Sequence, residues 1–383
     1  MKKYITFGAP LIGQKEIDSV SKCLKSGWIG TGPKAQEFER KFALYKKSKS
    51  SIALSSCSAA LHISLQSLNL KKGDEVITSA LTFCSTVNSI ILSGAKPVLA
   101  DVDLETQNIS PKEILKKINK NTKALIIVHF AGRPCNMNEI LKIVKRFKLT
   151  LIEDCAHAIE SRYHGKHCGT FGAYGCFSFY ATKNLVTGEG GMIVTNKNKN
   201  IQKLKQLTLH GMSKDAWRRF SDDGYKHYDV IDLGYKYNMT DIQASIGLEQ
   251  LKKVESFWRQ RQKIWNIYNN FFKDLNVSIP GKIEKNTKHA YHLYTILIDK
   301  KNCGIDRDKF LKEMHKSGIG TGVHYRSIPS HTFYRKKFGW NNKNFKNACQ
   351  IGEQTVSIPL SAKLTESDVF RITNEAKKIL KNA

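Results

Sequence analysis

The chain has 383 residues, 41% of them hydrophobic, and no apolar run reaches the roughly 20 residues that a membrane-spanning helix needs. This composition excludes a disordered chain and a helical membrane protein, and it predicts one large domain with a smaller one, or two domains. The formal net charge of +29 leaves binding to nucleic acid or another polyanion open, but the lysines are scattered through predicted surface helices, and no zinc-finger, RRM or basic-zipper pattern appears. We therefore expect no membrane or nucleic-acid partner and attribute the charge to composition and to phosphorylated ligands.

Nine cysteines, an odd number without a CxxC pair, indicate reduced thiols and a cytoplasmic protein. Cys57, Cys84, Cys155 and Cys176 lie among apolar or small residues, and we interpret them as buried. The first residues resemble a signal peptide only faintly, because Gly8 and Pro10 break the apolar run and no small-residue cleavage site follows.

Two early segments have the composition of binding loops. The loop Gly27-Trp28-Ile29-Gly30-Thr31-Gly32-Pro33 is either a plain turn or a flexible lip with an aromatic contact. Next, a predicted strand over 51–54 runs into the serine-rich turn 55–58 and a helix with leucines at helical spacing. A helix N-terminus after a strand favours an anion, although N-capping by Ser56 or Ser58 explains the same residues and is compatible with it.

Further apolar strands are predicted over 73–78, 96–101, 124–129 and 149–152, with helical patterns between them. Strands alternating with helices indicate an α/β fold with a mostly parallel, doubly wound sheet. Phe83 follows one of these strands and could pack in the core or stack on a planar ring.

The chain is organised around a lysine and an aspartate. The predicted strand 149–152 ends in Glu153-Asp154, which places Asp154 where open α/β sheets bind ligands. Lys183 follows a predicted half-buried strand that carries Phe177 and Phe179 on one face. A desolvated lysine has a lowered pKa and can attack a carbonyl, whereas a lysine snorkelling from a strand end is inert. Together with Ser178, the pair fits pyridoxal phosphate, which needs a lysine for its aldehyde, an anion for its ring nitrogen and donors for its phosphate.

The second part of the chain changes character. The segment 210–232 is polar and aromatic and is predicted to be a long loop; a helix over 242–251 and a long helix through Trp258, Trp265 and Tyr268 follow. Smaller strands and helices alternate from Tyr291 onward. We predict a large cofactor-binding domain over 1–245, with 1–35 partly a lip over the substrate, and a small C-terminal domain over 246–383.

Six motifs in order resemble the DegT/StrS family of sugar-nucleotide aminotransferases, from about Gly8 to Leu380. They are Gly27 to Pro33, Gly73 to Thr78, His129-Phe130-Ala131-Gly132, Glu153 to Ala158, Ser178 to Gly191 and Gly234 to Gln243. The resemblance implies the aspartate-aminotransferase type fold (fold type I), with a mostly parallel central sheet and a smaller C-terminal α/β domain.

The resemblance also implies roles for the residues around the cofactor. Lys183 would bind pyridoxal 5'-phosphate covalently and move the proton, Asp154 would pair with the ring nitrogen, and His157 would lie near the 3-hydroxyl. Other positions would hold the cofactor phosphate or stack on the ring: Ser58, Ala59 and Ser178 for the phosphate, and Phe83 for the ring. Asn238 would reach the phosphate from the neighbouring subunit, so a homodimer with shared active sites is expected.

On the substrate side, the stretch Gly318 to Arg326 is similar to members that aminate C4 of a UDP-linked 4-keto sugar, such as the UDP-4-amino-4-deoxy-L-arabinose and UDP-4-amino-4,6-dideoxyhexose enzymes. His324 and Tyr325 are candidates for sugar binding, together with Trp28, Gly30 and Thr31 of the lip. The segment 327–331 departs from the family pattern, which leaves the sugar and its nucleotide (UDP, dTDP or GDP) open.

The implied reaction transfers an amino group from L-glutamate, through pyridoxamine phosphate, to the keto group, yielding an amino sugar for a surface polysaccharide or glycan. C3-amination or dehydration on the same cofactor is an alternative, although the dehydratases of the family have histidine where this chain has Lys183. A non-catalytic, basic polyanion-binding protein is a second alternative. His157, His164, His167 and Cys168 follow no zinc-site spacing, and we expect no metal.

Overall fold

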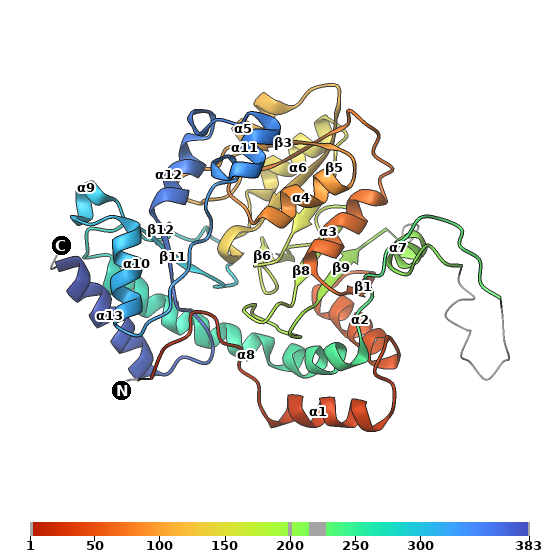
Figure 1. Ribbon diagram of the computed structural model, residues 1–383, viewed down its shortest axis with the longest axis horizontal. Coiled ribbons are helices and arrows are strands. Elements are labelled where there is room, and N and C mark those ends of the chain that lie inside the picture. Colours follow the sequence, from red (N-terminus) through yellow and green to blue (C-terminus); the bar gives the residue numbers. More distant parts are fainter. Residues whose placement is uncertain (1–2, 198–200, 214–226, 382–383) are drawn as a thin grey trace.

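A seven-stranded sheet forms the centre of the computed structural model, which describes residues 3–197, 201–213 and 227–381 (Figure 1). The strand order is β1-β9-β8-β5-β4-β2-β3. The strands are β1 (Ser50–Leu54), β2 (Glu75–Ser79), β3 (Lys96–Ala100), β4 (Thr122–Val128), β5 (Thr150–Asp154), β8 (Tyr174–Ser178) and β9 (Gly191–Thr195). Only the pairings that involve β9 are antiparallel within this sheet, so the predicted mostly parallel α/β sheet is confirmed.

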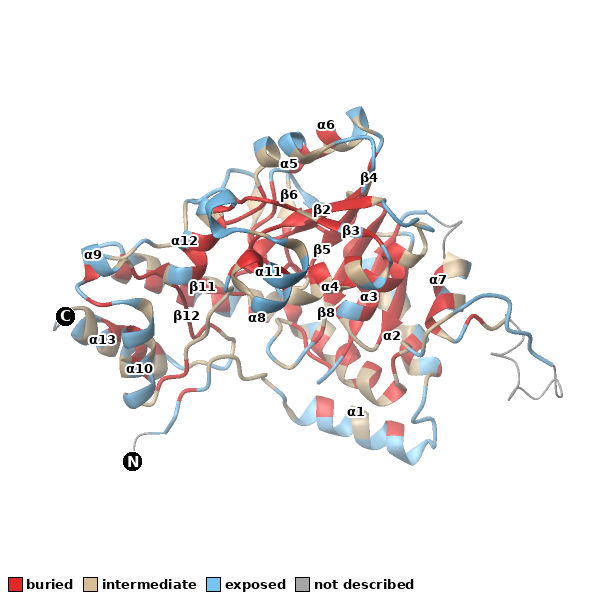
Figure 2. Ribbon diagram, turned by 45° about the horizontal axis from the view of Figure 1, so that its top comes forward, coloured by how far each residue is buried: buried red, intermediate tan, exposed pale blue. Residues whose placement is uncertain are grey.

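Helices cover both faces of this sheet (Figure 2). One face packs against α3 (Cys57–Gln66), α4 (Cys84–Leu92) and α7 (Ile201–Thr208). The other packs against α2 (Pro33–Lys46), α5 (Pro111–Lys117), α6 (Met137–Arg146) and α8 (Asp241–Phe272). In β1, Ile52 and Leu54 therefore join one apolar cluster while Ala53 joins the other.

The prediction of a half-buried strand before Lys183 was wrong. Phe177 of β8 packs toward α2, and Cys176 on the opposite face packs toward α3, and both are completely buried. The alternation of large and small residues in β8 thus reflects two different neighbouring layers, because a central strand of a doubly covered sheet has no solvated face.

A single 32-residue helix, α8, connects the two parts of the fold, where the sequence suggested two successive helices. Its second half packs against a two-stranded sheet, β11 (Tyr294–Leu297) with β12 (Thr355–Ile358), and against α10 (Arg307–Lys316) and α13 (Glu366–Lys381). The predicted domain division at residue 246 falls inside α8 and stays a prediction.

The remaining elements are short or peripheral. They are α1 (Gln14–Lys25), α9 (Lys300–Cys303), α11 (Thr332–Phe338), α12 (Lys346–Gln354), and the three strands β6 (Arg162–Tyr163), β7 (Lys166–His167) and β10 (Thr287–Lys288), which pair in the order β10-β6-β7. Most of the loop predicted over 210–232 lies outside the described residues. Within the described ranges, no helix has both the length and the apolar character to cross a membrane.

All nine cysteines are free thiols. Eight are buried, including Cys57, Cys155 and Cys176, as expected from their surroundings in the sequence. Cys84 is only half-buried, because it begins α4 beside the exposed Phe83 at the edge of the sheet.

Candidate active site

The carboxyl ends of the parallel strands border a cavity of about 340 Å³. Such an edge is where open α/β sheets bind ligands. Fifteen residues from the loops that follow β1, β2, β5 and β8 and from the C-terminal part line it: Ser56, Cys57, Ser58, Phe83, Ser85, Asp154, Ala156, Ser178, Tyr180, Thr182, Lys183, Glu189, Gly190, His324 and Tyr325. Seven of these are predicted site residues. They come from segments far apart in the sequence, and the fold brings them to one cavity.

Lys183 lies in the turn after β8 and lines this cavity. Burial of the amine lowers its pKa to about 8, against the opposing influence of Cys57 and Asp154. Removal of water disfavours the charged form of an amine, so a substantial neutral fraction exists near neutral pH. Lys183 is therefore not a lysine that snorkels to solvent, and it can act as a nucleophile.

Asp154 ends β5 and contributes a buried carboxyl group to the same cavity. Its Oδ2 accepts a hydrogen bond from the Thr86 hydroxyl at 2.8 Å, and its Oδ1 accepts one from the backbone N–H of Ala156 at 3.1 Å. Burial raises the pKa of this carboxyl, while these hydrogen bonds and Lys183 act in the opposite direction. The carboxyl is thus held in a fixed orientation and is well placed to hold a proton on a bound base.

Thr86 was missed by the sequence analysis. It lies one turn after Phe83 on the first turn of α4, and a hydroxyl at that spacing could have been recognised as a partner for a strand-end carboxylate. Phe83 itself is 55% exposed and lines the cavity, so the structure excludes the alternative that it is a core residue.

The N-terminus of α3 lies at the cavity. Ser56 caps the helix by accepting the backbone N–H of Ala59 at 3.1 Å, and Ser56, Cys57 and Ser58 line the cavity. The first-turn N–H groups of a helix lack intrahelical partners, and the helix dipole favours an anion there. Of the predicted phosphate residues, Ser58 and Ser178 line the cavity, whereas Ala59 is buried and does not, and its N–H is bound to the cap.

His157, His324 and Tyr325 form the aromatic wall beside Lys183. His157 is buried behind the cavity, and its Nε2 lies 2.9 Å from the Tyr325 hydroxyl. His324 lines the cavity, stacks on Phe7 at 5.3 Å and lies with its Nδ1 2.7 Å from the Ser357 hydroxyl. Burial, assisted by the charge of Lys183, lowers the pKa of His324 to about 3, so this imidazole is neutral.

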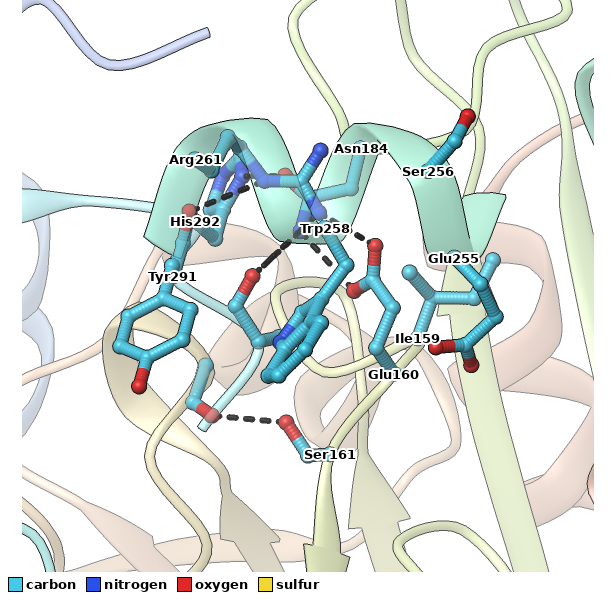
Figure 3. A network of polar contacts seen from close by, with 12 residues as sticks. Ile159, Glu160, Ser161, Asn184, Glu255, Ser256, Trp258, Arg261, Tyr291 and His292 are labelled. Carbon is cyan, nitrogen blue, oxygen red and sulfur yellow. Dashed lines mark hydrogen bonds and ion pairs between the residues drawn. The ribbon is translucent and has the colours of Figure 1, made fainter. Parts of the chain in front are cut away.

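A network of polar contacts joins Arg261 of α8 to Glu160 and Asn184, the residue that follows Lys183 in the chain (Figure 3). Arg261 of α8 forms an ion pair with Glu160 at 2.5 Å, and Glu160 also accepts a hydrogen bond from Asn184 at 3.0 Å. The Asn184 side-chain oxygen lies 3.0 Å from Nδ1 of His292, whose ring packs 4.5 Å from that of His157. No local sequence pattern predicts this network, because its members come from four distant segments.

The lip residues and Asn238 lie elsewhere in this chain. The Asn238 side chain donates a hydrogen bond to the Thr31 hydroxyl, and these two residues line a separate cavity of about 200 Å³. Trp28 is 54% exposed, and the Gly30 carbonyl accepts the backbone N–H of Asp241 at 2.6 Å. A single chain thus does not bring these four predicted residues to Lys183.

The residues weighed as metal ligands do not converge. His164 stacks on Tyr163 at 4.3 Å, whereas His157 belongs to the aromatic wall. Among the described residues, His129, Glu153 and Cys155 do have ligand atoms within 4.8 Å of one another. Glu153 accepts hydrogen bonds from the backbone N–H groups of Gly169, Phe171 and Gly172. These bonds explain its carboxyl group as a support for the loop before β8, without a metal.

Comparison with known proteins agrees with this arrangement. Residues 10–377 match the model of the DegT/DnrJ/EryC1/StrS aminotransferase family. The chain belongs to this family. The spore coat polysaccharide biosynthesis protein SpsC of Bacillus subtilis is 40% identical over 381 residues, which cover 99% of this chain and 98% of SpsC.

Two solved structures have the same fold as this chain. Spr1654 from Streptococcus pneumoniae, designated a sugar aminotransferase, is 31% identical in its PMP form, with a TM-score of 0.93 and 99% of both chains covered. PseC of Helicobacter pylori, an aminotransferase involved in the biosynthesis of pseudoaminic acid, is 28% identical, with a TM-score of 0.93 and 100% of both chains covered. The predicted fold type is thereby confirmed.

Pyridoxal phosphate is the cofactor of this family, and Spr1654 is also known in its PLP form. The residues of this chain fit the group. A buried amine, a buried carboxyl and a serine-capped helix N-terminus face one cavity, and they match the aldehyde, the ring nitrogen and the phosphate. The protein is a PLP-dependent aminotransferase.

Proposed function

We propose that this enzyme transfers an amino group from L-glutamate to a keto carbon, at C4, of a nucleotide-linked deoxy sugar. The observation that carries the proposal is the convergence of Lys183, Asp154 and the N-terminus of α3 on one cavity. The names of SpsC, Spr1654 and PseC, which point to polysaccharide synthesis and sugar amination, support a sugar as the acceptor. The amino sugar would serve a surface polysaccharide or glycan.

Each part of the site has a task in this reaction. When bound, pyridoxal phosphate supplies an electron sink and carries the amino group from donor to acceptor. Lys183 would hold the cofactor through its neutral amine and, when that amine is free, would take the proton from the reacting substrate carbon and return it. Asp154 would hold a proton on the ring nitrogen, and Ser58 and Ser178 with the start of α3 would hold the phosphate.

The sugar would bind on the side of His324 and Tyr325. The His324 ring is neutral and is held by Phe7 and Ser357, so it can exchange hydrogen bonds with sugar hydroxyls without carrying a charge. The positive charge of the chain would attract the phosphates of the nucleotide.

A second copy of the chain would complete the site. Asn238 and the lip residues Trp28, Gly30 and Thr31 do not line the cavity of Lys183 in their own chain, which is compatible with a shared site. We propose a homodimer in which Asn238 reaches the cofactor phosphate of its partner and the lip contacts the partner's substrate.

The acceptor can be identified by half-reactions. The protein is loaded with cofactor, treated with L-glutamate until the visible band of the lysine-bound cofactor disappears, and freed of excess donor. UDP-, dTDP- and GDP-linked 4-keto and 3-keto sugars are then added separately. We expect a UDP-linked 4-keto sugar to restore the band and to yield a C4 amine by NMR; restoration by 3-keto sugars alone would refute C4-amination. A deoxygenated product without an amine would indicate dehydration.

A further inference from the structure

The hydrogen bonds of His157 have a defined direction. Its Nδ1 lies 3.2 Å from the backbone nitrogen of Ala131, and a backbone N–H can only donate. Nδ1 is therefore the acceptor. Burial, together with the nearby Lys183, lowers the pKa of His157 well below its usual range, so the ring is neutral and carries its single hydrogen on Nε2.

This direction determines what Tyr325 can do. Nε2 of His157 must donate to the Tyr325 hydroxyl, at 2.9 Å, because the opposite direction would place two donors against each other at Ala131. The Tyr325 hydroxyl oxygen is thus an acceptor toward His157, and its own hydrogen remains available. Tyr325 lines the cavity with Lys183, and its hydroxyl lies close enough to Asp154 for that charge to raise its pKa, after the larger effect of burial.

We propose that Tyr325, oriented by His157, donates a hydrogen bond to the 3-hydroxyl oxygen on the ring of the bound cofactor. The proposal rests on the assignment of Lys183 in the proposed function. The expectation from sequence placed His157 at the 3-hydroxyl of the cofactor. We assign that contact to Tyr325 instead, because both nitrogens of His157 already have hydrogen-bond partners within the protein. His157 is then a positioning residue, and Tyr325 is the residue that contacts the cofactor.

The 3-hydroxyl oxygen is a neighbour of the carbon through which the cofactor would be joined to Lys183. A hydrogen bond to this oxygen should therefore change the pH at which the linking nitrogen loses its proton. Negative charge on this oxygen retains the proton of the nitrogen that links Lys183 to the ring. A hydrogen bond from Tyr325 draws charge from the oxygen, and that proton then leaves at a lower pH. The visible band of the lysine-bound cofactor reports this titration directly.

Other titratable groups face these two side chains. Lys183, His292 and His324 face His157, and Asp154, Cys57 and Cys84 face Tyr325. Burial keeps His292 and His324 neutral by lowering their pKa values, and it raises those of Cys57 and Cys84, which keeps both thiols protonated. A Tyr325→Phe substitution changes none of these groups and fills the same space, so any shift reports the lost hydroxyl.

The experiment is a pH titration of the visible band of the cofactor-loaded protein. We expect Tyr325→Phe to raise the midpoint by about one pH unit, the size of one hydrogen bond to a charged acceptor. His157→Leu should move the midpoint in the same direction, whereas His157→Gln, which can accept from Ala131 and donate to Tyr325, should restore it. Tyr334→Phe is the matched control, because its hydroxyl bonds to Asn88 and its ring does not line the cavity.

The outcomes separate the two claims. A band whose midpoint is the same in Tyr325→Phe and the unaltered protein would overturn the role of Tyr325 and leave Lys183 intact. A shift in Tyr334→Phe equal to that in Tyr325→Phe would overturn it as well, since the effect would not then be local. If the unaltered protein gave no visible band, the assignment of Lys183 would fail and this proposal with it.

Discussion

Lys183 owes its chemistry to burial rather than to a charged neighbour. The two nearby groups that influence it, Cys57 and Asp154, favour the charged form, yet its pKa still falls to about 8 because water is excluded from the amine. The same surroundings raise the pKa of Asp154. One apolar environment thus prepares a nucleophile and a proton-holding group in a single cavity.

The rate of cofactor attachment should follow the neutral amine of Lys183. Its pKa in the fold is lowered from 10.5 to about 8, so the reactive form grows about tenfold per pH unit below 8 and is nearly complete above 9. Stopped-flow absorbance of cofactor-free protein mixed with pyridoxal phosphate should show a rate that rises through pH 8 and levels off above about pH 9. A rate that still climbs at pH 10 would mean an ordinary, solvated lysine.

Asp154→Asn keeps the shape of the side chain and its hydrogen-bonded position but cannot hold the ring nitrogen as a charged pair. We expect kcat to fall about 10²–10³-fold while the cofactor still binds. Thr86→Val is the graded control: it removes one hydrogen bond of Asp154, at 2.8 Å, and should cost about tenfold. Steady-state kinetics would contradict this role if Asp154→Asn stayed within about twofold of the unaltered enzyme.

At the scale of elements, the junction of α2 and α8 depends on one buried carboxylate. Asp241, the first residue of α8, accepts the backbone N–H groups of Gly32, Lys34 and Ala35 at 2.8, 3.0 and 2.9 Å and so caps α2. The side chain is completely buried. This contact fixes the lip loop against the start of α8, where Asn238 also lies.

Asp241→Ala should leave those three N–H groups without partners and lower the free energy of unfolding by about 3–5 kcal/mol. Thr240→Ala, which removes only the cap of α8 one residue earlier, should cost about 1 kcal/mol. Urea denaturation of both variants measures the difference. Equal losses would show that Asp241 is not the main link between the two helices.

Elements with a strong local signal were predictable from the sequence. The end of β5 at Asp154 and the start of α3 at Cys57 follow from apolar runs and capping chemistry, and the cap is Ser56, one of the two serines considered. The two covered faces of β8 were not predictable, because a period of two in Phe177 and Phe179 has the same appearance whether the second face meets solvent or α3. The network of Glu160, Asn184 and Arg261 depends on tertiary contacts that no local pattern encodes.

At the scale of the whole molecule, the proposed shared site joins residues that do not line one cavity within a single chain. Asn238 could be recognised only through resemblance, and together with Thr31 it lines a different cavity from that of Lys183. The role that we propose for Asn238 at the phosphate therefore involves a second chain. The charge of +29 is spread over the chain, and neither its sequence pattern nor the site assigns it to a separate function.

A shared site makes a prediction about mixed dimers. Lys183→Ala and Asn238→Ala proteins should each be inactive or weak alone, because each lacks one part of every site. Unfolded together and refolded as a mixture, they should recover about a quarter of the unaltered activity, since half of the dimers then hold one complete site. A mixture no more active than its components, with dimers present by light scattering, would place Asn238 and Lys183 in separate roles.

The central claim, that Lys183 carries the cofactor for amino transfer, is tested most directly by the visible spectrum of the purified protein. With pyridoxal phosphate we predict a yellow band that disappears on addition of L-glutamate and returns with a keto sugar. The Lys183→Ala protein should fold normally by circular dichroism and show no such band and no multiple turnover. A band of equal strength in Lys183→Ala, or a band in the unaltered protein that is indifferent to L-glutamate, would contradict the account.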